Sequence, residues 1–302
     1  MIRRLIAVLA AMATTVPSSA MMMGSTKLTP SYSLDAKYDD NIYRVTKNVN
    51  NTATNGGGIR GSWIFVNALG LNSETPVSEN SKLSLGYKFT AENYSTKQSK
   101  ANNAYNQNVD AAWAFKGART EAKVWDSYTN TQDPMFNPNG ATHSTVVNGP
   151  LVRRARRSQN ALGLSADYFL GEKFFVGLDT EWTINRYLNR AGGIQALSNV
   201  LNNSVWRYGG KMGYLIAPKT KMFTAVHRTV THYTEETRID HHRDTAVDFG
   251  ISGELSAKMK GLVQTGLVYQ NFDRDPSNPN RQRIGRHWTS SVQLDYKPTD
   301  RC

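Results

Sequence analysis

The run that most resembles a reactive site is Asp240-His241-His242-Arg243-Asp244, which places two imidazoles between two carboxylates. Such a set could supply a general base, but catalysis needs that base within hydrogen-bond reach of a nucleophile or a water. The sequence offers no paired partner motif for His242 or for His232, and neighbouring residues of a strand point to opposite faces. We therefore expect a polar loop here and no catalytic residue.

A metal site is equally weak, because adjacent histidines do not readily converge on one ion. Asp39-Asp40-Asn41 offers oxygen ligands for calcium, but a run of this kind more often starts a loop. We expect no metal and no cofactor.

A second group of candidate functional residues consists of charged side chains. In the stretches that carry this group, charged or polar residues alternate with apolar ones. Its acids and bases are mixed, so it could form a polar, selective wall or a network of ion pairs that fills a narrow interior. These residues are Asp35, Lys37, Lys82, Lys88, Asp110, Asp167, Asp179, Glu181, Arg207, Lys211, Asp248 and Asp295.

These side chains must be positioned by β-strands, and the stretch from Lys82 to Ala91 shows the pattern of one. Leu83, Leu85 and Tyr87 point one way while the lysines and Gly86 point the other, as the period of two in a strand requires. Much the same pattern recurs about a dozen times. The predicted strands are about 29–38, 61–69, 82–91, 108–115, 122–128, 162–168, 174–182, 206–214, 222–233, 247–251, 263–269 and 288–296.

Connections between these strands alternate between long and short. A turn with Pro76 ends the second strand, residues 253–256 form another turn, and the longest polar connection is about 130–159. This alternation predicts an all-β fold, a transmembrane antiparallel up-and-down β-barrel with short periplasmic turns and long extracellular loops. The twelve charged residues above would line its lumen. A secreted β-sandwich or solenoid is the main rival.

Excess positive charge gathers in the predicted long loops. It could form a basic vestibule for anions, bind lipopolysaccharide phosphates through forked hydrogen bonds, or simply be solvated. The loop residues are Arg153, Arg154, Arg156, Arg157, Arg281 and Arg283.

The N-terminus reads as a secretory signal: basic Arg3-Arg4, an apolar core to Val16 and a small-residue cleavage site ending at Ala20. We therefore predict a signal peptide at 1–20 and a barrel at 21–302. The formal net charge of +12 favours polyanionic partners, and export argues against nucleic acid. The only cysteine is Cys302, so no internal disulfide can form.

Two stretches carry a family resemblance. Residues 34–44, LDAKYDDNIYR, resemble the entry strand of the outer-membrane barrels called β-barrel porin 2, and residues 288–299 resemble a later strand and turn of that family. The resemblance implies an outer-membrane protein with a pore or export role, associated in some members with exopolysaccharide. Further strands follow this point in the family, which favours a C-terminally truncated copy.

From these observations we expect a non-enzymatic, porin-like channel or an accessory of exopolysaccharide export in the Gram-negative outer membrane, working by passive diffusion through a polar lumen. A membrane-embedded hydrolase and a non-conducting structural or adhesion barrel are the alternatives. The expected partners are outer-membrane lipid and lipopolysaccharide, the barrel-assembly machinery, and polysaccharide or small anionic solutes.

Overall fold

The computed structural model describes residues 12–16, 19–39, 61–95, 103–136, 151–188, 202–234, 241–256, 258–273 and 284–296. These residues form strands joined by turns. The strands are β1 (Met12–Val16), β2 (Met21–Met23), β3 (Thr26–Asp39), β4 (Ser62–Ser78), β5 (Ser81–Tyr94), β6 (Ala104–Lys116), β7 (Thr120–Phe136), β8 (Leu151–Leu170), β9 (Phe174–Leu188), β10 (Asn203–Ala217), β11 (Thr220–Tyr233), β12 (His242–Ser256), β13 (Met259–Phe272) and β14 (Ile284–Tyr296).

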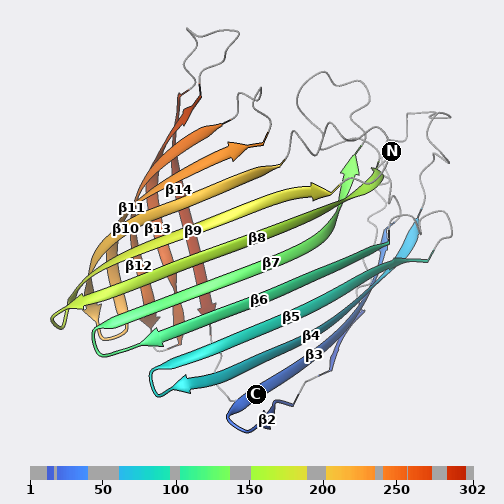
Figure 1. The fold of residues 1–302 in the computed structure, drawn as a ribbon, viewed down its shortest axis with the longest axis horizontal. Coiled ribbons are helices and arrows are strands. Elements are labelled where there is room, and N and C mark those ends of the chain that lie inside the picture. The colour runs from blue at the N-terminus through green and yellow to red at the C-terminus, as the bar shows by residue number, and fades with distance from the viewer. Residues whose placement is uncertain are drawn as a thin grey trace, which may run out of the picture.

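All fourteen strands belong to one antiparallel sheet, and from β3 to β14 each strand pairs with the next in the chain. Successive hairpins therefore run side by side in sequence order, as the colours of Figure 1 show. The predicted all-β, up-and-down fold is confirmed, and the twelve predicted strands correspond to β3 to β14. The short β1 lies inside the predicted signal segment and pairs with β3, while the signal itself stays a prediction.

Several predicted boundaries were wrong. Residues 130–136 and 151–159 belong to β7 and β8, so most of the predicted loop at 130–159 is a paired hairpin arm. Pro76 lies inside β4, next to a register shift, where a missing backbone N–H is tolerated. Gly253 also lies within a strand, β12, with φ of +124° beside another register shift. Backbone ladders need no apolar side chains, so strands continue where the apolar alternation stops.

The two faces of the sheet differ in chemistry. One face, here called the outer face, carries large apolar side chains that remain exposed, among them Leu178, Trp206 and Phe249 at 50%, 55% and 61%. The opposite, inner face carries the charged residues. In β4, where Trp63, Ile64 and Phe65 are consecutive large apolar residues, the register decides the faces. Trp63 and Phe65 lie on the outer face, and Ile64 is buried against Tyr94 on the inner one.

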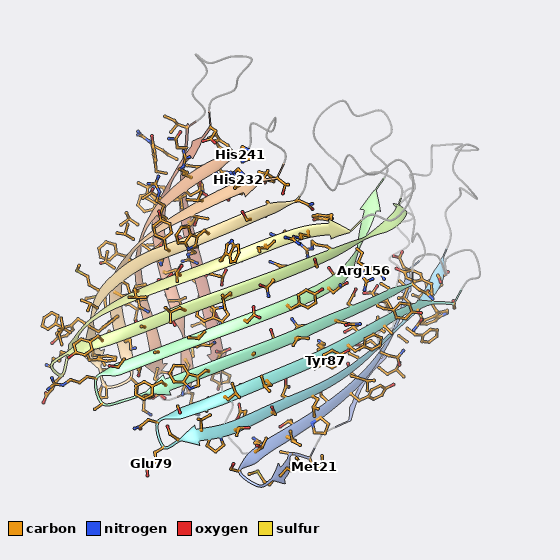
Figure 2. The ribbon with its side chains drawn as sticks, viewed as in Figure 1. Met21, Glu79, Tyr87, Arg156, His232 and His241 are labelled. Atoms are coloured by element: carbon orange, nitrogen blue, oxygen red, sulfur yellow. The ribbon has the colours of Figure 1, made fainter. Side chains whose placement is uncertain are left out.

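The sheet is strongly curved, with its inner face concave. Figure 1 shows β11 to β14 standing nearly upright against the slanting β5 to β9. The short turns gather at one end of the strands, where Figure 2 labels Glu79, and the long connections at the other, where it labels His232 and His241. Concavity places charges from distant strands face to face.

The sheet is open within the described residues. There β14 pairs with β13 alone, and the first edge is formed by β1 and β2, which both pair with β3. The inner face of β14 is correspondingly exposed from His287 to Asp295. No helix among the described residues is long and apolar enough to cross a membrane.

Candidate functional site

The structure places all twelve predicted lumen residues on the inner face of the sheet. Their strands alternate faces residue by residue, and the pairing register keeps the same parity from strand to strand, for example from Asp167 to Gly177 to Lys211. The concave face is therefore polar and charged, as the alternation predicted. Its residues divide into one interacting group at the short-turn end, a second around His227, and further charges outside both.

The interacting group is centred on Asp167 of β8. Lys211 of β10 reaches it across β9, with Nζ 2.8 Å from Oδ1. The intervening residue is Gly177, where any Cβ would collide with both side chains. The absence of a side chain on the middle strand thus permits an ion pair between two strands that are not neighbours.

Lys221 of β11 extends this group across the concavity. Its Nζ lies 2.9 Å from Oε2 of Glu121 on β7 and 3.4 Å from Oδ2 of Asp167. Lys116 lies 3.1 Å from the other oxygen of Glu121. The ammonium also sits over the rings of Phe169 and Phe175, 4.9 and 5.3 Å from their centroids. We call Lys116, Glu121, Asp167, Lys211 and Lys221 the inner ion network.

A second cluster surrounds His227 of β11. Its Nε2 lies 3.1 Å from Oδ1 of Asp179 on β9, and its Nδ1 lies 3.3 Å from Oδ2 of Asp248 on β12. His227 and Asp248 are both buried. Because both ring nitrogens face carboxylate oxygens, the imidazole acts as a bridge between two strands and offers no free nitrogen to a substrate.

A further group of charged residues lies beside the short β12–β13 turn. It is closer to the turn than Ile251, the last apolar residue of β12 on the outer face. Glu254 is 3.0 Å from Lys260 and 3.2 Å from Lys219. Hydrogen bonds from Lys260 and then Lys219 hold the pKa of this exposed carboxyl below its ordinary value. This group at the short-turn end, here called the rim, thus has two lysines around one acid.

Two of the remaining predicted residues make contacts outside both clusters. Asp110 accepts a hydrogen bond from Ser127, and Lys82 lies 3.8 Å from Glu74 with both side chains exposed. Lys116, Glu121, Lys221 and His227 were missed by the sequence reasoning. The signal for the last two was the irregular alternation of 222–233, where Lys221, Ala225 and His227 in fact share the inner face.

The predicted basic loop is only partly a loop. Arg153, Arg154, Arg156 and Arg157 lie in β8, because the β7–β8 pairing continues past Thr131 and Arg157 to Met135 and Arg153. Arg156 donates to Asn130 from the outer face. Arg281 and Arg283 fall outside the described residues.

The described histidines of the run make contacts with different partners. His241 stacks on His232 with ring centroids 4.5 Å apart, and both lie together at the long-connection end in Figure 2. His242 Nε2 is 3.8 Å from Asp244, beyond hydrogen-bond range. Among the described residues, no group of three His, Cys, Asp or Glu side chains is arranged to hold a metal ion.

Comparison with solved structures supports one fold. Two variants of the ferric enterobactin receptor PfeA from Pseudomonas aeruginosa match 86% of the chain at 9% and 10% identity, each with a TM-score of 0.51. The fold is that of an outer-membrane β-barrel protein. The chain spans only 40% of the receptor's length.

A third match is OmpT, an outer membrane protein of Vibrio cholerae, at 8% identity, with 94% of this chain, 97% of that chain and a TM-score of 0.42. No family model matches the sequence, and no curated protein does. The narrower resemblance to β-barrel porin 2 therefore stays a hypothesis.

Proposed function

We propose that this protein is an outer-membrane β-barrel that acts as a porin-like channel or as an accessory of exopolysaccharide export, after the pattern of the β-barrel porin 2 family. The observation that carries the proposal is the division of the sheet into an apolar, exposed outer face and a charged, concave inner face. An exposed apolar face is stable in contact with lipid, whereas a charged inner face is stable in contact with water or a polar solute.

The mechanism we propose is passive diffusion along the inner face. The ion network at the short-turn end carries three lysines against two acids, and at the far end of β8 the alternation places Arg157 on the inner face while Arg156 lies on the outer one. Fixed positive charge at both ends of a pore raises the local concentration of anions. We therefore propose a bias toward anionic solutes, with acidic polysaccharide as one candidate.

An enzymatic function is not part of this proposal. The support is that both ring nitrogens of His227 face carboxylate oxygens and that His232 stacks on His241. Alanine at both His232 and His242 should leave any hydrolysis of lipid or peptide by the purified protein unchanged. A loss of such hydrolysis would favour the hydrolase.

Planar-bilayer recording of the purified protein tests the channel. We expect discrete conductance steps and a reversal potential that shows anion preference across a potassium chloride gradient. Because conduction needs a closed wall, the same recording tests whether the edges of the sheet come together. A membrane-integrated protein with no conductance would instead be a structural or adhesion barrel.

A further inference from the structure

The outer face contains an arginine for which the structure provides no counter-charge. Arg228 of β11 has the same parity as Val226 and Val230, pairs with Tyr208 on β10 and Thr245 on β12, and is exposed. No described side chain lies within ion-pair or hydrogen-bond distance of its guanidinium. A cation on the lipid side of a barrel costs about 2–4 kcal/mol at mid-bilayer and close to nothing at the headgroups.

Arg228 lines one of two hollows on this face, and Trp206 lines both. The hollow on the short-turn side is apolar, with Leu178 and Val226 around Gly210, whose missing side chain opens it. The hollow on the long-connection side is lined by Trp182 and His232 in addition to Trp206. Arg228 thus lies on β11 between Val226, which lines the first hollow, and Val230, which lines the second.

Further arginines extend the positive charge along the same face. Starting from Arg228, the pairing row passes through Thr245 and Tyr269 to Arg286 of β14. The Arg286 guanidinium lies over the ring of Tyr269, 5.5 Å from its centroid. Arg243, one step nearer the long connections, is paired with Asp273 at 3.3 Å.

We propose that Arg228 and its two hollows form a binding site for a phosphorylated acyl lipid. Guanidinium groups bind phosphate oxygens through paired hydrogen bonds, which an unpaired arginine at headgroup level supplies. The acyl chain lies in the hollow over Gly210, toward the bilayer centre, and the headgroup lies against Trp182 and His232. This site rests on the proposed membrane location and names its lipid partner.

The test uses diphosphorylated lipid A and its dephosphorylated form, titrated into the delipidated, detergent-solubilised protein and counted by native mass spectrometry. Arg228→Gln removes the phosphate ligand. Gly210→Val fills the apolar hollow, and it should fold because a Cβ at this position would meet only the Gly177 carbonyl oxygen, at 3.8 Å. Lys123→Gln is the matched control, since it removes one positive charge from the inner face.

We expect Arg228→Gln to weaken binding of the phosphorylated lipid at least about tenfold, because the variant loses charge-assisted hydrogen bonds to the phosphate. Binding of the dephosphorylated lipid should not change. Gly210→Val should weaken both lipids, and Lys123→Gln neither. Equal affinities in wild type and Arg228→Gln would overturn the site.

Two further measurements distinguish a failure of the proposed lipid site from a failure of the proposed membrane function. If millimolar inorganic phosphate displaces the lipid fully, the site recognises free phosphate and the lipid assignment is wrong. If the wild-type protein stays in the aqueous fraction when membranes are sedimented, the proposed membrane function fails as well. Membrane partition without phosphate preference rejects this site alone.

Discussion

Gly209 of β10 lies directly opposite His227 of β11, and its missing side chain leaves the space through which the imidazole reaches Asp179 on β9. A Cβ at Gly209 would lie 2.6 Å from the Val226 carbonyl oxygen and closer still to the His227 ring. The bridge between β9, β11 and β12 therefore depends on a residue that makes no side-chain contact itself.

This relationship predicts opposite effects for two adjacent glycines. Gly209→Ala should lower the unfolding free energy by about 1–3 kcal/mol, because it displaces His227 and leaves buried Asp248 without its partner. Gly210→Ala adds the same methyl group to the open outer face and should be neutral or stabilise by up to about 1 kcal/mol. Urea unfolding in detergent, followed by gel mobility, measures both. Equal destabilisation would contradict the structure at this site.

The inner ion network predicts a measurable coupling between distant strands. Lys221→Met leaves the carboxylates of Glu121 and Asp167 each with one lysine fewer, in a partly buried site. We expect a loss of about 1–2 kcal/mol in unfolding free energy. A double-mutant cycle with Glu121→Gln should give a coupling energy above about 0.5 kcal/mol.

The control for this pair is Lys82→Met. Lys82 and Glu74 are 3.8 Å apart with more than half of each side chain exposed, so the loss should be below about 1 kcal/mol. A flat sheet would keep Lys221 and Glu121 four strand spacings, roughly 19 Å, apart at the backbone. Absence of coupling would therefore argue against the observed curvature.

The contrast between faces can be tested on β13 alone. Leu267 lies on the outer face and Gln264 on the inner face. In lipid vesicles, Leu267→Lys should lower the unfolding free energy by about 2 kcal/mol or more, since a lysine replaces an apolar group against hydrocarbon. Gln264→Lys should cost little because its side chain reaches the polar interior. A larger loss for Gln264→Lys than for Leu267→Lys would indicate that lipid contacts the face described here as the inner face.

The rim predicts a pH dependence. The pKa of Glu254 is below its ordinary value of 4.5 because Lys260 and Lys219 bond the carboxylate. The stabilisation is therefore present above that ordinary value and is lost as pH falls through the lowered pKa. Glu254→Gln should unfold at lower urea than wild type at pH 7, and the difference should shrink below pH 4.5 and vanish once the carboxylate of the wild type is protonated. A difference that persists in acid would rule out this linkage.

The fold was largely predictable because the side chains of a β-strand alternate between its two faces, whichever strand lies beside it. The period of two in 82–91 or 174–182 locates a strand and assigns its faces from local information alone. Boundaries were less predictable. Around Arg153 and Arg156 the polar composition indicated a loop, although backbone hydrogen bonds continue the β7–β8 hairpin without apolar side chains.

The sequence by itself therefore determined the inward parity of the twelve predicted charges and the alternation of short and long connections. Only the tertiary structure decided which inner-face side chains meet, including those that the sequence reasoning missed. Lys221 finds Glu121 because the sheet curves, and His227 finds Asp179 because register places Gly209 between them. Curvature and register are properties of many strands together, so no local pattern records them.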